Sequence, residues 1–173
     1  TTILISDGGR IGLGSTAGNM TITGSELGNI TAGTLTIGDS TAGAITVNGI
    51  TSANSTNIIT VDLNSPSIAF STGDSTFKGL TATANTGAIT GAAALTVAGT
   101  STFTTSASNQ SITLSSTSND FTGAVSFNTT GSSANTTLAT NSSIILGAST
   151  IGGDHSVTVG GTSKTMNISG AQD

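Results

Sequence analysis

The sequence has very little charge. Only 6% of its 173 residues are charged, against roughly a quarter in an average globular domain, and the helix-favouring residues Lys, Arg and Glu are nearly absent. This composition argues against an ordinary globular domain. The cations are Arg10, Lys78 and Lys164, and the formal net charge is −5. Because three scattered cations cannot neutralise a phosphate backbone, we expect no nucleic-acid partner.

Cysteine is absent and proline occurs once. Without cysteine the chain has no structural disulfide and no thiolate metal site, which is compatible with secretion by a bacterium. Pro66 cannot donate a hydrogen bond to a ladder of strands, so we expect it at a turn. The longest weakly polar run, residues 89–99, is too short and too rich in Thr and Gly to cross a bilayer as a helix. We therefore expect no membrane-spanning segment.

Threonine, serine and 24 glycines make up much of the chain. Thr is β-branched and suits the surface of a strand, while Gly supplies turns that need a positive φ. Disordered chains combine low hydropathy with high charge, whereas here the mean hydropathy is slightly positive and Ile, Val and Leu recur in pairs. The composition predicts a folded chain that is nearly all β.

A triplet of apolar residue, threonine and apolar residue recurs along the chain. In a short strand its two apolar side chains would face one side and its threonine the other. Clusters of Gly, Asn, Asp and Ser, which favour turns, separate the triplets. The triplets are Met20-Thr21-Ile22, Leu35-Thr36-Ile37, Ile45-Thr46-Val47, Leu95-Thr96-Val97, Ile112-Thr113-Leu114 and Val157-Thr158-Val159.

A longer repeat is marked by Phe77, Phe103 and Phe121, each of which follows a short polar stretch. Their mean spacing suits coils of about 20–25 residues, each with two or three short strands. Such coils form a parallel β-helix, or β-solenoid, in which each coil stacks on the previous one at about 4.8 Å. The chain would then form roughly eight coils. We expect all five phenylalanines, including Phe70 and Phe127, to be interior stacking residues.

Residues 1–173 are predicted to form a single β-solenoid segment. Ile3 and Ile5 begin a strand at once, and neither Thr1–Asp7 nor Met166–Asp173 has the pattern of a charged or helical cap. Open ends of a solenoid expose strand edges that can pair further. We therefore expect the segment either to be part of a longer chain or to stack end to end on copies of itself.

Much of the sequence resembles the repeat regions of large bacterial exoproteins of the filamentous haemagglutinin type. The stretches that carry this resemblance are DGGRIGLGSTAGNMTITGSELGNITAGTLTIG (7–38) and AITVNGITSANSTNII (44–59). SNDFTGAVSFNTTG (118–131) and SSIILGASTIGGDHSVTVGG (142–161) are similar to repeats of the same broad group of adhesins and autotransporter-like passengers. The resemblance implies a right-handed parallel β-helix, a secreted or bacterial cell-surface location, and a role in adhesion or cell-surface architecture. It also implies a host-surface or glycan receptor as a partner to be tested.

Two glycine patterns invite a catalytic interpretation, and both are weak. Gly12-Leu13-Gly14 fits a loose dinucleotide motif, but no helix signal follows it, so turn glycines explain it better. Gly38-Asp39-Ser40 and Gly73-Asp74-Ser75 resemble the nucleophile block of one esterase group. A nucleophile is needed once, whereas a turn is needed in every coil, so we interpret both as turns.

The only histidine, His155, follows Asp154. One histidine cannot build a multi-histidine metal site, and we expect both residues in a solvated turn. The eight acidic residues are scattered along the chain. We therefore expect no catalytic residue, no cofactor, no metal site and no enzymatic activity.

Two alternatives to a structural or adhesive exoprotein remain. A carbohydrate-active enzyme on a β-helix would need several carboxylates converging in one cleft, which the scattered acids do not suggest. An ice-binding solenoid would need two aligned threonines in every coil, and the variable coil length predicted here argues against that register.

Overall fold

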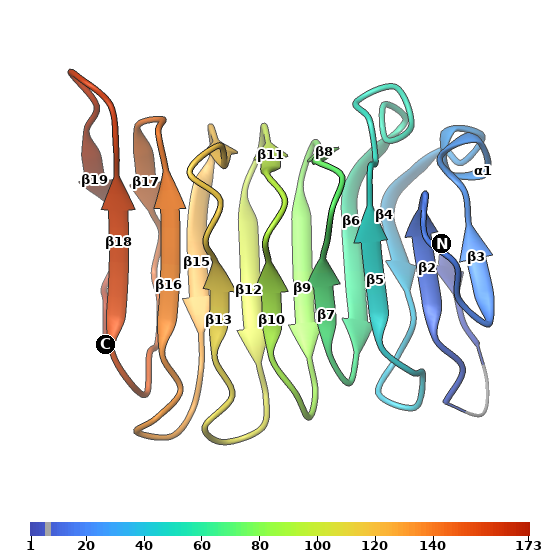
Figure 1. The fold of residues 1–173 in the computed structure, drawn as a ribbon, viewed down its shortest axis with the longest axis horizontal. Helices are drawn as coiled ribbons and strands as arrows, with labels where there is room; N and C mark the ends of the chain where they lie inside the picture. The colour runs from blue at the N-terminus through green and yellow to red at the C-terminus, as the bar shows by residue number, and fades with distance from the viewer. Residues whose placement is uncertain (6–7) are drawn as a thin grey trace.

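The computed structural model is a right-handed parallel β-solenoid (Figure 1). It describes residues 1–5 and 8–173; Asp7, one of the eight acidic residues, lies outside the described residues. Every pairing between its named strands is parallel, and the sheets stack along one axis. The predicted fold class is confirmed, since the one helix of the described residues is five residues long.

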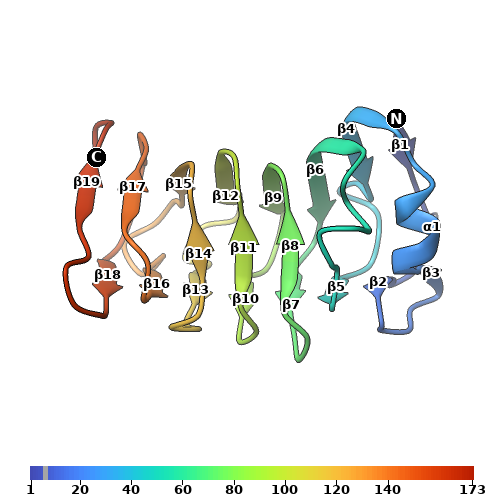
Figure 2. The same cartoon turned by 90° about the horizontal axis from the view of Figure 1, so that it is seen from above.

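Three parallel sheets form the faces of the solenoid (Figure 2). Sheet A contains, in spatial order, β1 (Thr2–Ile3), β4 (Ala32–Ile37), β6 (Ile58–Ser65), β9 (Leu80–Ala84), β12 (Ser101–Thr105), β15 (Ala124–Asn128), β17 (Ile144–Leu146) and β19 (Met166–Ile168). Sheet B contains β18 (His155–Val159), β16 (Thr136–Thr140), β13 (Ile112–Leu114), β10 (Ile89–Gly91), β7 (Ile68–Phe70), β5 (Ile45–Asn48), β2 (Ile11–Gly14) and β3 (Met20–Ile22). Sheet C contains β14 (Asp120–Phe121), β11 (Leu95–Val97) and β8 (Ser75–Phe77).

The coil length agrees with the prediction, but the number of coils does not. The number of residues between successive Cα partners in sheet B gives the length of each coil. Only the last of these lengths, from Thr136 to His155, falls just below the predicted range of coil lengths. These partners are Ile45, Ile68, Ile89, Ile112, Thr136 and His155.

The chain completes about six turns, fewer than the predicted eight. One reason is the first turn, from Ile11 to its partner Ile45, which is longer than the others because it also contains β3 and a short helix. Pro66 lies between β6 and β7, at the turn where we expected it.

Inward side chains of equivalent positions stack into columns, which form the core. In sheet B, one column runs through five buried isoleucines in register, and in sheet A Phe103 stacks on Phe127 at a ring-centroid distance of 5.8 Å. Ala82 lies next to Phe103 on its other side, so a small residue makes room for a large one. All five phenylalanines are buried, as predicted. The five isoleucines are Ile11, Ile45, Ile68, Ile89 and Ile112.

A short helix at the N-terminal end was not predicted. Helix α1 (Gly24–Gly28) follows β3, which lies beyond β2 at this end of sheet B (Figure 2). Thr23 and Glu26 form a capping box: the Thr23 hydroxyl accepts the Glu26 N–H, and the Glu26 carboxylate accepts the Thr23 N–H at 2.8 Å. The Thr23 N–H and, as the smaller contribution, the Thr23 hydroxyl, which donates to the same carboxylate at 2.9 Å, hold the pKa of Glu26 below its usual value. Leu27, on the inner side of the helix, is fully buried.

Candidate interaction surfaces

His155 does not lie in a solvated turn as predicted. It is the first residue of β18 and is in register with Thr136, so its ring faces the interior. Nδ1 is hydrogen-bonded to the Thr136 hydroxyl, the ring lies 5.6 Å from that of Phe127, and Nε2 is buried without a partner among the described residues. Asp154 is exposed, as expected, and donates its backbone N–H to the Asn135 side chain at 2.9 Å.

The position of His155 predicts a pH dependence of stability. Burial lowers the pKa of its imidazole from the ordinary 6.5, because the charged ring loses hydration. As the pH falls, the imidazole is therefore protonated in the unfolded chain before it is protonated in the folded chain. The free energy of unfolding is then highest above about pH 6.5 and declines below it. We expect the difference in melting temperature between pH 7.5 and pH 5.5 to be smaller in His155→Gln, which cannot titrate. The same difference in both proteins would contradict this assignment.

The glycine patterns serve the backbone of the solenoid. Gly12 and Gly14 are strand residues of β2, not turn residues, and Gly14 ends that strand with a φ of +87°. Asp39 closes a turn by accepting hydrogen bonds from Thr41 and Ala42. The Ser75 hydroxyl, which a nucleophile would expose, is buried and accepts the Ile50 N–H at 3.2 Å.

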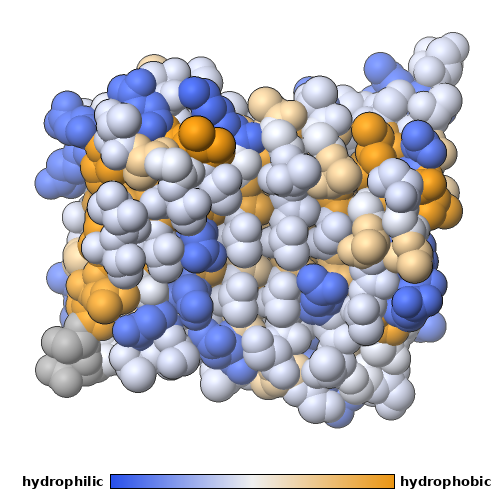
Figure 3. Space-filling view, turned by 180° about the vertical axis from the view of Figure 1, so that it is seen from behind, coloured by the Kyte–Doolittle hydropathy of each residue, from blue (hydrophilic) through white to orange (hydrophobic). Residues whose placement is uncertain are grey.

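The outer face of sheet A carries rows of small polar side chains (Figure 3). Thr81 and Thr83 of β9 are in register with Thr102 and Thr104 of β12. Two threonines per coil thus align here although coil length varies, because the extra residues lie outside the strands. The row does not continue: Asp62 and Asn64 precede these coils, and Ser126 and Asn128 follow them. The pairs of aligned threonines span only two coils of sheet A, which is not the continuous array that an ice-binding face needs.

Acidic groups do not converge in the described part of the chain. Across residues 1–5 and 8–173 there is no group of three or more His, Asp or Glu side chains placed to hold a metal ion. In the same residues no helix is long and apolar enough to span a membrane.

A slot opens beside β14 because one coil is shorter than its neighbours. Leu114 of β13 is in register with Leu138 of β16, whereas Ala124 of β15 is in register with Ile145 of β17. The later coil therefore has three residues fewer between sheets B and A, and residues 141–143 alone join them. Sheet C ends at β14 for this reason: the next coil has no strand to place beneath it.

The following coil moves outward again and forms the opposite wall of the slot. Six residues, 160–165, connect β18 to β19. They are tied to the floor of the slot by bonds from the Thr165 N–H to the Ser143 hydroxyl at 3.1 Å and from the Ile144 N–H to the Thr165 carbonyl at 2.9 Å.

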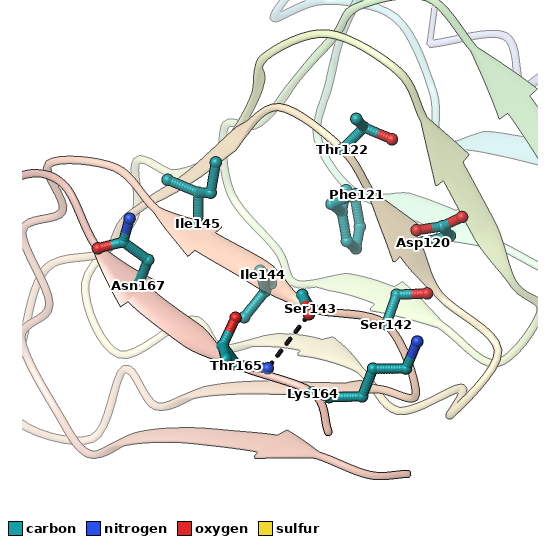
Figure 4. A pocket seen from close by; sticks show the side chains of 10 residues that line it. All are labelled: Asp120, Phe121, Thr122, Ser142, Ser143, Ile144, Ile145, Lys164, Thr165 and Asn167. Atoms are coloured by element: carbon teal, nitrogen blue, oxygen red, sulfur yellow. Dashed lines mark hydrogen bonds between the residues drawn. The ribbon is translucent and has the colours of Figure 1, made fainter. Parts of the chain in front are cut away.

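The slot is lined mostly by polar side chains, with a charged residue on each wall (Figure 4). Its volume is about 510 Å³, in the range of small-ligand pockets. Phe121 and Ile144 border the slot but are almost fully buried. Asp120 lies on the β14 side and Lys164 on the opposite wall. This site was not predicted from the sequence, because the difference of three residues becomes visible only once both registers are known.

The C-terminal end of the solenoid leaves inward positions uncovered. Met166 and Ile168 of β19 are in register with the buried Ile144 and Leu146, so their side chains belong to the inner face of sheet A. They are nevertheless 49% and 56% exposed. The apolar columns therefore reach this end without a covering layer in the described chain.

These features define the molecule as a repetitive parallel β-solenoid. A protein family described as "Repeats of unknown function (DUF5649)" matches residues 59–128. The matched stretch runs from within β6 to the last residue of β15 and contains all three strands of sheet C. No curated protein and no solved structure matches the chain.

Proposed function

We propose that the chain is a rod segment of an extracellular structural or adhesive repeat protein, secreted or held on a bacterial cell surface. In this role it has no catalytic activity and mediates adhesion or cell-surface architecture. The proposal joins the resemblance to filamentous haemagglutinin-type exoproteins with the repetitive solenoid and its weakly charged outer faces.

One observation carries the proposal: the apolar interior continues into the last strand. The inner side chains of β19, Met166 and Ile168, stand where a further coil would bury them. Burial of apolar surface contributes about 25 cal/mol per Å², and the free edges of β18 and β19 offer backbone groups for pairing. We infer that a further coil covers this end, supplied by neighbouring repeats of the same chain or by another copy.

Electron microscopy of the natively sourced protein tests this role. We expect elongated rods or filaments with a repeat near 4.8 Å along the axis. In the isolated 173-residue chain, Ile168→Glu should abolish end-to-end assembly, because it places a charge on the inner face. The matched change Thr158→Glu, on the outer face of β18, should leave assembly intact. Discrete short particles at high protein concentration would contradict assembly of copies.

The adhesive part of the proposal needs its own experiment. Purified protein would be applied to glycan arrays and to host-cell surfaces, with a heat-unfolded sample as the control. Saturable binding by the folded protein alone supports adhesion, while binding to neither surface leaves only the architectural role.

A further inference from the structure

We propose that His155 makes the docking of the last coil, residues 154–173, sensitive to pH: protonation of its imidazole favours release of this coil while the preceding coils stay folded. The proposal does not depend on the proposed role in adhesion. It rests on the position of the ring in β18, on the lack of a partner for an added proton, and on the weak burial of the last coil.

The imidazole joins β18 to the preceding coil. Its Nδ1 is hydrogen-bonded to the Thr136 hydroxyl of β16, its ring lies 5.6 Å from that of Phe127 in β15, and Nε2 is buried without a partner among the described residues. Protonation places a hydrogen on both ring nitrogens, so Nε2 then carries a buried N–H that has no acceptor. The half-buried ring also loses part of the hydration that stabilises its charged form. Both effects favour a state in which the ring leaves β16 and reaches water.

No charged group of the surrounding elements compensates an imidazolium at this position. Residues 121–153, which include β15, β16 and β17, contain no titratable side chain. The charged residues of the last coil are Asp154, Lys164 and Asp173, and all three are exposed. Among the described residues none of them is hydrogen-bonded to the ring, and burial alone lowers the pKa of His155. The charge would therefore stay unpaired as long as the last coil is docked.

The last coil is only weakly held by burial. Every residue of the described chain after Ser149 is half-buried or exposed, whereas β15 and β16 have buried residues at alternate positions. β18 and β19 are also the end strands of their sheets, so each pairs on one side only. Segments with few buried contacts open at a lower free energy than the whole fold. An unpaired charge at His155 should therefore release residues 154–173 before it unfolds the other coils.

Release of the last coil would change the surface at the C-terminal end of the solenoid. Leu138 of β16 is in register with Val157, and Leu146 of β17 is in register with Ile168. Both leucines are fully or almost fully buried while the last coil is docked. Without it they become the end of the apolar columns, and β16 and β17 become the free strand edges. Mild acid would thus exchange one exposed end for another with different side chains.

Native-state hydrogen exchange of the 173-residue chain, followed by NMR at pH 7.5 and pH 5.5, tests the proposal. Protection factors, which are corrected for the intrinsic effect of pH on amide exchange, should be lower at pH 5.5 in β18 and β19. The fall should be several-fold, with a limit of about tenfold set by an unfolded-state pKa of about 6.5. In β10, in the middle of the solenoid, protection should change by less than about twofold, because opening of the last coil does not expose it.

Two variants assign the effect to this imidazole. His155→Phe keeps a ring against Phe127 but cannot titrate, so protection in β18 should no longer depend on pH; if this variant does not fold, His155→Gln serves in its place. Adding Thr158→His puts an imidazole on the exposed face of the same strand and should not restore the dependence. The proposal is overturned by equal falls in β18 and β10, by a change in β18 of less than about twofold, or by the same fall with and without His155.

Discussion

Replacing Ile112 with aspartate is expected to unfold the solenoid. Ile112 is fully buried in the sheet B column between Ile89 and Thr136. Loss of the isoleucine side chain costs about 2–5 kcal/mol, and an unpaired carboxylate in the apolar interior adds several more. The total is comparable with the whole stability of about 5–15 kcal/mol of a typical domain. The same result is expected for Ile45→Asp, because Ile45 occupies the same column.

The control for this prediction is Asp39→Ala, which changes a turn. Asp39 accepts hydrogen bonds from the Thr41 hydroxyl and N–H, both at 2.7 Å, and these bonds lower the pKa of its carboxyl. They lie at the surface and support one connection, so their loss should lower the melting temperature by only a few degrees. Circular dichroism during heating measures all three variants. Equal losses of melting temperature would contradict the assignment of the apolar side chains to the interior.

The strands could be predicted from the sequence because their pattern is local. Each apolar-Thr-apolar triplet lies in a strand, and in Leu35-Thr36-Ile37 both apolar side chains are fully buried while Thr36 faces outward and donates to Asp62. The mean spacing of the phenylalanines predicted the coil length because Phe77 and Phe121 occupy one column of sheet C two coils apart, with Val97 between them. Phe103 lies in a different column, in sheet A, which explains the unequal individual spacings. The capping box at Thr23 and Glu26 was equally local, so α1 could have been predicted from the same sequence.

Apart from α1, the features that escaped prediction depend on register between distant segments. Asp154 and His155 have the composition of a turn, but pairing with β16 places His155 beneath Thr136 and against Phe127. The slot beside β14 depends on a difference of three residues between two registers, in sheets B and A. No single stretch of sequence contains that difference. Aligned threonines on β9 and β12 were discounted for the same reason, because coil length alone does not determine register.

Asn119 is expected to be the most important polar residue of the core. Its buried side chain joins three consecutive coils: the oxygen accepts the Leu95 N–H at 2.8 Å, and Nδ2 donates to the Leu114 carbonyl at 3.2 Å and to the Ala139 carbonyl at 3.0 Å. Asn119→Ala would remove these three hydrogen bonds from buried backbone groups. Each unsatisfied buried group costs about 1–3 kcal/mol, so we expect a loss of about 3 kcal/mol or more in the free energy of unfolding.

The loss should also be local, which separates it from the effect of a general packing defect. Asn119 directly precedes β14, and its carbonyl accepts the Thr140 hydroxyl at 2.6 Å, so its replacement should loosen the corner where sheet C meets sheet B. Native-state hydrogen exchange should speed up first at Leu95 and in β14. The matched control is Asn57→Ala, at an exposed asparagine before β6, which should change the free energy of unfolding by less than about 0.5 kcal/mol. A similar small change for Asn119→Ala would show that its three hydrogen bonds do not hold the coils together.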